Sequence, residues 1–132
     1  PLPPELRESP PIILIVDDEV EVLELLKSVM HTGEEELELL CARGGVEALL
    51  MIGERKPDLL ILDIMMPGMN GYEVCSKLKA SASTQNIKIV AITGNHDPTV
   101  RERILRSGAD LFFTKPLNVR EFRSECLKLM QS

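Results

Sequence analysis

Residues 59–71 read "LLILDIMMPGMNG", and this stretch decides where the rest of the chain must be placed. Its first four residues, Leu59 to Leu62, are aliphatic, which is typical of a short strand buried on both faces of a sheet. The run ends at a carboxylate, Asp63, and a second apolar stretch follows before Pro67 and Gly68. An isolated buried carboxylate is costly unless it is paired, hydrogen-bonded or bound to metal. Asp63 therefore needs either partners or a function.

The size and charge of the chain limit the kinds of partner that it can hold. Its 132 residues suit a single domain, which buries roughly two-thirds of its unfolded surface. The 15 basic and 21 acidic side chains give a net charge of −6. This balance argues against binding of nucleic acid or an anionic membrane by the domain itself. Aromatic residues make up only 3% of the chain, which argues against a platform for stacking bases.

The three cysteines, Cys41, Cys75 and Cys126, are far apart and form no CxxC or Cys/His cluster. This pattern argues against a zinc site or a disulfide framework and fits a reducing compartment. No apolar run approaches the roughly 20 residues of a membrane span. No basic-then-apolar signal segment opens the chain. The sequence therefore predicts a cytoplasmic protein.

Residues 1–11, "PLPPELRESPP", contain five prolines and few apolar residues. Such a composition is typical of a linker, and we interpret the segment as a linker or an expression remnant outside the fold. The folded domain is then expected to occupy residues 12–131.

Short apolar runs in the remaining chain predict five strands. They lie at 12–16 ("IILIV"), 37–42 ("LELLCA"), 59–62, 87–92 ("IKIVAI") and 111–113 ("LFF"). The second is the weakest, because its Glu and Leu residues also suit the continuation of a helix. Between the runs, apolar residues at helical spacing predict helices over 19–31, 45–55, 70–80, 97–108 and 118–130.

The helix boundaries carry capping signals. Asn70 and Asn118 each precede a glutamate at capping-box spacing, and Asp97 precedes a proline at the first helical position. Asp18 and Glu21 have the same spacing, so Asp18 is a candidate N-cap. Gly108 is expected to end the fourth helix. Strands alternating with helices predict an α/β domain whose mainly parallel sheet is covered on both faces.

In open parallel sheets, sites gather at the carboxyl ends of the strands. Here those ends carry Asp17 and Asp18, Asp63, Thr93, and Thr114 with Lys115. If they meet, three carboxylates with all-oxygen ligands suit Mg²⁺. A carboxylate beside Mg²⁺ can attack phosphorus and form an aspartyl phosphate. The metal and an ammonium group would neutralise charge on the transferring phosphoryl group.

Four motifs in order resemble the receiver domain of two-component response regulators. They are "VDDE" (16–19), "LDIMMPGMNG" (62–71), "AITG" (91–94) and "TKPL" (114–117). Each motif alone is weak, but the four in this order are highly specific. The resemblance covers roughly residues 12–130. The resemblance implies a flavodoxin-like, doubly wound fold with five strands in the order 2-1-3-4-5 and five helices.

The resemblance also implies roles for individual residues. Asp63 would be the phospho-acceptor, Asp18 would bind Mg²⁺ directly and Asp17 largely through water, and the Met65 backbone carbonyl would complete the metal site. Lys115 would pair with the phosphoryl group, and the Lys115–Pro116 bond would be cis.

A conformational switch is part of the same resemblance. Thr93 would move toward the phosphoryl group, and Phe112 falls at the position of the switch aromatic, although Phe113 beside it could take the buried side. The surface of the fourth helix, fifth strand and fifth helix would respond. His31 and His96 are interpreted as surface residues without the surroundings of a phospho-donor. The phosphoryl group would therefore come from a histidine kinase or a phosphotransfer protein, and the domain would not be an enzyme.

Other classes remain open at this stage. A phosphohydrolase working through an aspartyl phosphate would need a second acid two residues after its nucleophile, and Glu19 after Asp17 is a poor match. A flavin-binding flavodoxin-like domain would need a hydroxyl-rich phosphate loop where this chain carries acids. An interaction module with a receiver fold that is never phosphorylated is a further alternative.

Overall fold

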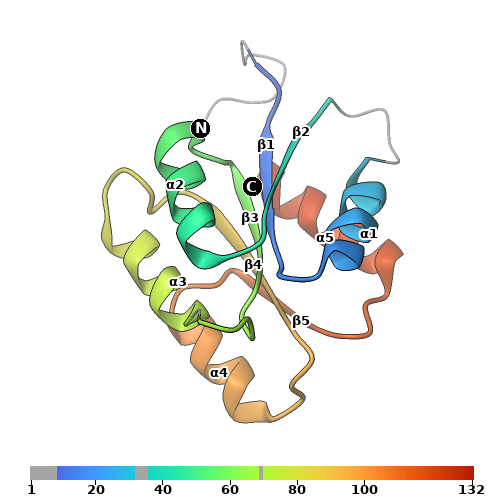
Figure 1. Ribbon diagram of the computed structural model, residues 1–132, viewed down its shortest axis with the longest axis vertical. Coiled ribbons are helices and arrows are strands. Elements are labelled where there is room, and N and C mark those ends of the chain that lie inside the picture. The colour runs from blue at the N-terminus through green and yellow to red at the C-terminus, as the bar shows by residue number, and fades with distance from the viewer. Residues whose placement is uncertain (1–8, 32–35, 69) are drawn as a thin grey trace.

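Five strands alternate with five helices in the computed structural model, which describes residues 9–31, 36–68 and 70–132 (Figure 1). In chain order the elements are β1 (Ile12–Val16), α1 (Val20–Met30), β2 (Glu38–Ala42), α2 (Gly45–Arg55), β3 (Leu59–Asp63), α3 (Gly71–Ala80), β4 (Lys88–Thr93), α4 (Pro98–Arg106), β5 (Leu111–Thr114) and α5 (Val119–Gln131). Most of the expected linker, residues 1–8, lies outside the described residues.

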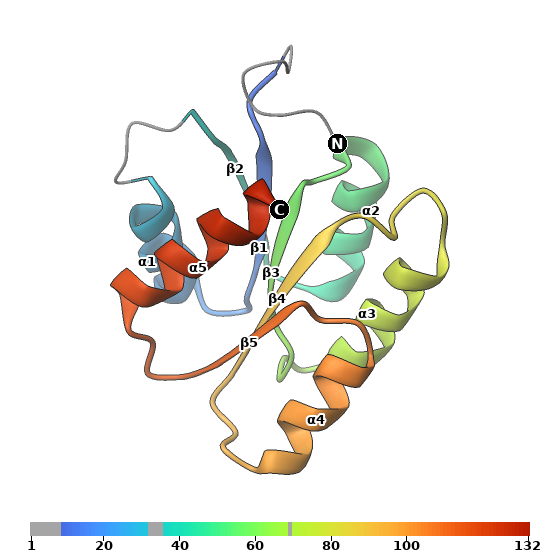
Figure 2. The same cartoon turned by 180° about the vertical axis from the view of Figure 1, so that it is seen from behind.

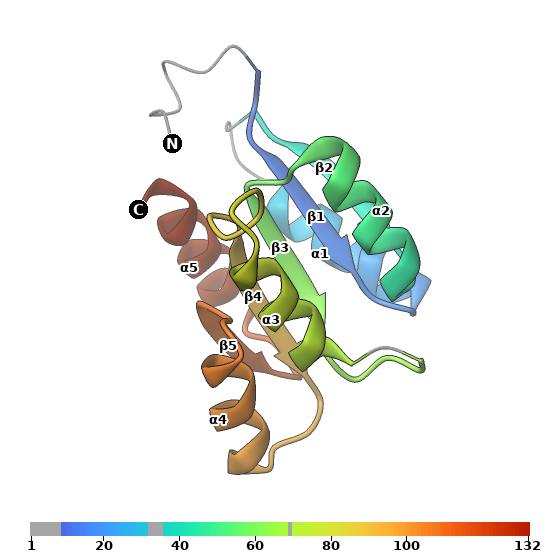
Figure 3. The same cartoon turned by 90° about the vertical axis from the view of Figure 1, so that its left-hand side faces the viewer.

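The strands form one parallel sheet in the order β2-β1-β3-β4-β5, which confirms the predicted flavodoxin-like topology. Helices α1 and α5 cover one face, and α2, α3 and α4 cover the other (Figures 1 and 2). Every strand therefore ends at the same edge of the sheet, as the arrowheads of β1, β3 and β4 show in Figure 3.

The central strands are buried on both faces, as the aliphatic runs predict. In β3 every residue is buried, and successive side chains alternate between two apolar clusters. Leu60 and Leu62 pack with α2, α3 and α4, whereas Leu59 and Ile61 pack with α1 and α5. This packing on both sides fixes the direction of the strand, and so it fixes the place where Asp63 emerges.

The ambiguous segment near residue 38 is a strand and does not continue a helix. It pairs in parallel with β1 over five positions, from Ile12↔Glu38 to Val16↔Ala42. The ladder satisfies backbone groups of both strands, and this pairing outweighs the helical preference of Glu and Leu.

The predicted caps of the last three helices are confirmed. The side chains of Asn70, Asp97 and Asn118 accept hydrogen bonds from the backbone N–H groups of Glu73, Thr99 and Glu121, respectively. Helix α4 stops before Gly108, whose φ is +119° and whose N–H donates to the Leu105 carbonyl. A glycine readily adopts this backbone conformation, so Gly108 ends the helix as expected.

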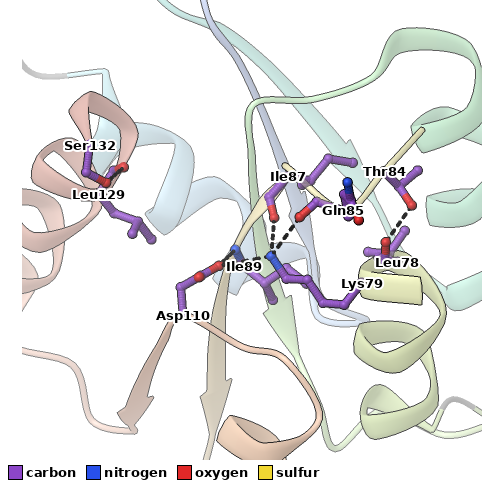
Figure 4. Close-up of polar contacts among 9 residues, drawn as sticks. All are labelled: Leu78, Lys79, Thr84, Gln85, Ile87, Ile89, Asp110, Leu129 and Ser132. Atoms are coloured by element: carbon purple, nitrogen blue, oxygen red, sulfur yellow. Dashed lines mark hydrogen bonds and ion pairs between the residues drawn. The ribbon is translucent and has the colours of Figure 1, made fainter. Parts of the chain in front are cut away.

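A polar cluster ties α3 to the start of β4 and β5, at the edge of the sheet opposite the strand ends (Figure 4). The Lys79 Nζ donates to the Ile87 carbonyl at 2.8 Å and to the Gln85 carbonyl at 3.3 Å, and it lies 3.5 Å from the Asp110 carboxylate. That carboxylate also accepts the Ile89 N–H at 2.7 Å. The cluster therefore holds three segments together with one ammonium and one carboxylate.

Replacing Asp110 with alanine is expected to lower the free energy of unfolding by about 1–3 kcal/mol, because the Ile89 N–H loses its acceptor. Asp110→Asn is the matched control. It keeps a side-chain oxygen for Ile89 but removes the charge, which costs under about 1 kcal/mol for a pair this exposed. Urea unfolding of the two variants measures the difference. Equal losses would show that the ion pair to Lys79, and not the Ile89 bond, dominates.

Candidate functional site

The sheet brings all the predicted strand-end residues to one edge. Asp17 and Asp18 follow β1, Asp63 ends β3, Thr93 ends β4, and Lys115 follows β5. Since β1 and β4 both flank β3, the acids and the hydroxyl converge on Asp63.

Three carboxylates form a compact cluster at this edge. One oxygen each of Asp17, Asp18 and Asp63 lies within 4.8 Å of the others. Asp17 and Asp63 are only 1% and 6% exposed, whereas Asp18 is half-buried. Buried acids this close repel one another unless a cation or donors compensate.

Two backbone donors orient the buried acids. The Glu19 N–H donates to Asp17 Oδ1 at 2.9 Å, and the Met65 N–H donates to Asp63 Oδ1 at 3.0 Å. Helix α1 has Glu19 as its N-cap residue, and its N-cap has no side-chain bond, so the interpretation of Asp18 as an N-cap is wrong. The spacing suggested Asp18, but it is Asp17 that receives a bond from the loop backbone. Asp18 does not cap the helix, and its carboxylate lies beside those of Asp17 and Asp63.

Lys115 supplies the cation. Its Nζ lies 3.4 Å from Asp17 Oδ2 and 3.3 Å from Asp63 Oδ2, so it bridges the two most buried acids. Desolvation opposes the charge of the ammonium, but attraction by Asp63 and Asp17 outweighs it and raises the pKa of Lys115. The ammonium therefore stays charged and held against the acids.

Asp17 carries the clearest electrostatic strain. Burial is the largest cause that raises its pKa, and repulsion by Asp63 adds to it. The Glu19 N–H and Lys115 lower it, but the balance still raises the pKa of Asp17 to about 6. A cation placed among the three acids would relieve this strain.

The loop after Asp63 is held in place by a close approach. A Cβ on Gly71, the first residue of α3, would lie 2.7 Å from the Ile64 Cβ. Only glycine fits there, so Ile64 packs directly on the helix and Met65 turns back toward Asp63. The side chain of Met65 is 55% exposed, and its backbone stays next to the acid cluster.

Thr93 ends β4, the strand next to β3, and the two phenylalanines belong to β5, on the far side of β4. Thr93 is fully buried, and its Oγ1 accepts the Asn95 N–H at 3.1 Å. Phe112 packs with the cluster under α2, α3 and α4. Phe113 packs on the opposite face, with its ring edge-on to Phe122 at 5.0 Å between ring centres. Both rings are half-buried.

Two contacts of the site were not visible in the sequence. Arg43, after β2, donates to the Asp18 backbone carbonyl at 3.3 Å. His96, after β4, has its Nε2 2.9 Å from the Lys115 carbonyl. His96 is exposed, as expected, but it has a partner across the site. The Lys115–Pro116 peptide bond is cis.

The arrangement of donors fits a hard divalent cation. Carboxylate oxygens from the ends of two neighbouring strands are ligands that Mg²⁺ takes, and Mg²⁺ keeps several waters in such sites. The three residues of the cluster all offer hard oxygen ligands. In the part of the chain that the structure describes, none of the helices combines the length and the apolar character that a membrane span needs.

Comparisons with known proteins agree with this geometry. The response regulator receiver domain family matches residues 13–126. The chain is 41% identical to the response regulator PleD of Caulobacter vibrioides over 106 residues, which is 80% of this chain and 23% of that protein. It is 33% identical to histidine kinase P4 of Formosa agariphila over 120 residues, covering 91% of this chain and 8% of that protein.

Solved structures give the same result. The signal receiver domain of a DNA-binding response regulator from Colwellia psychrerythraea superposes with a TM-score of 0.87 at 30% identity, covering 92% of this chain and 99% of that one. The signal receiver domain of a histidine kinase from Syntrophus aciditrophicus has a TM-score of 0.80 at 34% identity, covering 91% and 89%. The chain spans less than a quarter of the two curated relatives named above, and its match lies in a receiver domain in both solved structures. This chain belongs to the response regulator receiver domain family.

Proposed function

We propose that this receiver domain accepts a phosphoryl group on Asp63 from a phosphohistidine of a histidine kinase or phosphotransfer protein. The observation that carries the proposal is the Lys115 ammonium held 3.3 Å from Asp63 inside a cluster of three acids. An acid with only a structural role on the surface would not need a half-buried ammonium group beside it. An acid that must carry a phosphoryl group needs cations on both sides.

The proposed reaction transfers a phosphoryl group from a donor nitrogen to Asp63. A carboxylate oxygen of Asp63 forms a bond to phosphorus while the bond from phosphorus to the donor nitrogen breaks, and that nitrogen keeps the electron pair. The Met65 N–H donates to Asp63 Oδ1 and so fixes the orientation of the carboxylate. Lys115 neutralises charge on the phosphoryl oxygens. Mg²⁺, held by Asp17, Asp18, Asp63 and the Met65 carbonyl, would supply further positive charge when bound.

The added charge would act as a switch. It would draw the Lys115 ammonium and the Thr93 hydroxyl toward Asp63 and repack Phe112 under α4. The surface of α4, β5 and α5 would change as a result. Phe112 has no hydroxyl, so its two positions would differ in packing alone. On this proposal the domain is a signalling module without turnover of a separate substrate, and its free thiols suit the cytoplasm.

Beryllofluoride, which mimics an acyl phosphate, tests the switch directly. In the presence of Mg²⁺ we expect the backbone amide resonances of Asp63, Thr93 and Phe112 to shift together, because one bound group would engage all three. Mg²⁺ without beryllofluoride is the control, and it should shift only the resonances around Asp17, Asp18 and Asp63.

The other outcomes are distinct. Shifts confined to the acid cluster would show that the site binds the ligand without switching. No response to beryllofluoride, despite Mg²⁺ binding, would refute phosphoryl acceptance and leave a receiver-shaped interaction module.

A further inference from the structure

His96 joins two loops that flank the acid cluster. It lies in the loop between β4 and α4, and its Nε2 is 2.9 Å from the backbone carbonyl oxygen of Lys115, just after β5. A carbonyl oxygen can only accept a hydrogen bond, so Nε2 must carry the hydrogen. The bond spans 19 residues of sequence and connects the Thr93 side of the site to the Lys115 side.

The same loop sets the orientation of the Thr93 hydroxyl. Thr93 Oγ1 accepts the Asn95 N–H at 3.1 Å, and the Asn95 side-chain oxygen accepts the Asp97 N–H at 2.9 Å. Asp97 in turn caps α4. The orientation of the Thr93 hydroxyl therefore depends on hydrogen bonds made by Asn95 and Asp97 in this loop.

Only one side of the His96 bond is free to move. The Lys115 backbone is fixed, because its N–H donates to the Thr93 carbonyl at 2.8 Å as an extension of the sheet. The loop has more room, since a Cβ on Gly94 would meet no atom within 4 Å. The Lys115 carbonyl is thus a fixed anchor, and the loop that carries His96 is the part that can be released.

We propose that His96 is a positioning residue that holds the β4–α4 loop in its resting arrangement and so restrains Thr93. The inference rests on the proposed function. When Thr93 moves toward a phosphoryl group on Asp63, its Oγ1 would leave the Asn95 N–H, and the loop would rearrange around that freed donor. The bond from His96 to Lys115 opposes this movement. Breaking it makes the active arrangement easier to reach.

Replacing His96 with alanine is expected to tighten beryllofluoride binding in saturating Mg²⁺ by about twofold to tenfold, the effect of one net hydrogen bond. Mg²⁺ affinity should stay unchanged, because none of the three acids is touched. Two conservative variants sharpen the test. Glutamine places its amide nitrogen near the position of Nε2, whereas asparagine places it near Nδ1. His96→Gln should therefore behave like the native protein, and His96→Asn like alanine.

Two further measurements separate the restraint from a general loss of structure. His31→Ala is the matched control, since His31 is also exposed and lies after α1, and it should leave beryllofluoride affinity unchanged. The ¹⁵N shifts of the imidazole in the native protein should show a single Nε2–H tautomer for His96. Thermal unfolding of each variant checks that the fold is intact.

Each outcome has a separate meaning. If the native protein binds beryllofluoride and His96→Ala binds it equally or more weakly, the restraint is refuted while the proposed function stands. A glutamine variant that matches alanine also refutes it. If the native protein binds no beryllofluoride at all, the proposed function fails and the restraint fails with it.

Discussion

Replacing Asp63 with asparagine is expected to leave the protein folded but unable to take up a phosphoryl group. An amide oxygen is a far weaker nucleophile than a carboxylate, so no acyl phosphate should form. The fold should survive for two reasons. Asparagine keeps an oxygen that can accept the Met65 N–H, and it removes the repulsion that Asp63 exerts on buried Asp17.

Intact mass after incubation with acetyl phosphate and Mg²⁺ measures the effect. The native protein should gain one phosphoryl group, and Asp63→Asn should gain none. Asp58→Asn is the matched control, because Asp58 precedes the same strand at its opposite end and its side chain accepts the Ile12 N–H at 2.8 Å. This control should be phosphorylated like the native protein. A phosphoryl group on the Asp63 variant would mean that another acid is the acceptor, and the proposal for Asp63 would be wrong.

Mg²⁺ affinity is expected to fall about tenfold for each pH unit below the pKa of Asp17, which is about 6. Below that pH a proton occupies Asp17 and must leave before the cluster can hold a divalent cation. Above it Asp17 is already charged, so the affinity should be nearly constant. The sign follows from burial, which raises this pKa well above the 3.8 of a free aspartate.

Calorimetric titration with Mg²⁺ at several pH values between 5 and 8 tests this expectation. Asp17→Asn removes the titrating group, so its affinity should be weaker at pH 7.5 but should lose most of its pH dependence near 6. An affinity of the native protein that stays constant from pH 8 down to pH 5 would show that Asp17 titrates like an ordinary surface acid. The acid cluster would then be less strained than its burial implies.

The sequence was sufficient to predict the residues of the site that lie at the carboxyl ends of the parallel strands. Aliphatic runs located the central strands, and the residue after each run had to emerge at the carboxyl edge. Asp17, Asp63, Thr93 and Lys115 were all predictable in this way, and the structure brings them together. Strand β2 was harder, because its Glu and Leu residues become a strand only through pairing with β1.

The contacts that the sequence could not predict depend on how loops meet in space. The capping-box spacing pointed to Asp18, but the direction in which the chain leaves β1 brings the Glu19 N–H to Asp17 instead. Arg43 reaches the Asp18 carbonyl across 25 residues, and His96 reaches Lys115 across 19. No local sequence pattern indicates contacts over such separations, so His96 was interpreted only as a surface residue and Arg43 was not singled out.

The two phenylalanines of β5 show a similar limit. Alternation along a strand requires neighbouring side chains to point to opposite faces, and the sequence could go no further than that. The structure assigns Phe112 to the face of α4 and Phe113 to the face of α5.

The two outer strands of the sheet, β2 and β5, are only five and four residues long. An unpaired strand edge is a template on which another protein can add a strand, and shortness is one way in which natural sheets blunt this tendency. On the proposed function, the domain would have to meet a phosphoryl donor and then release it, and edges with so few free backbone groups would favour that release. Contacts with a partner would then be made through side chains and stay reversible, and neither strand addition between the two proteins nor aggregation would be favoured.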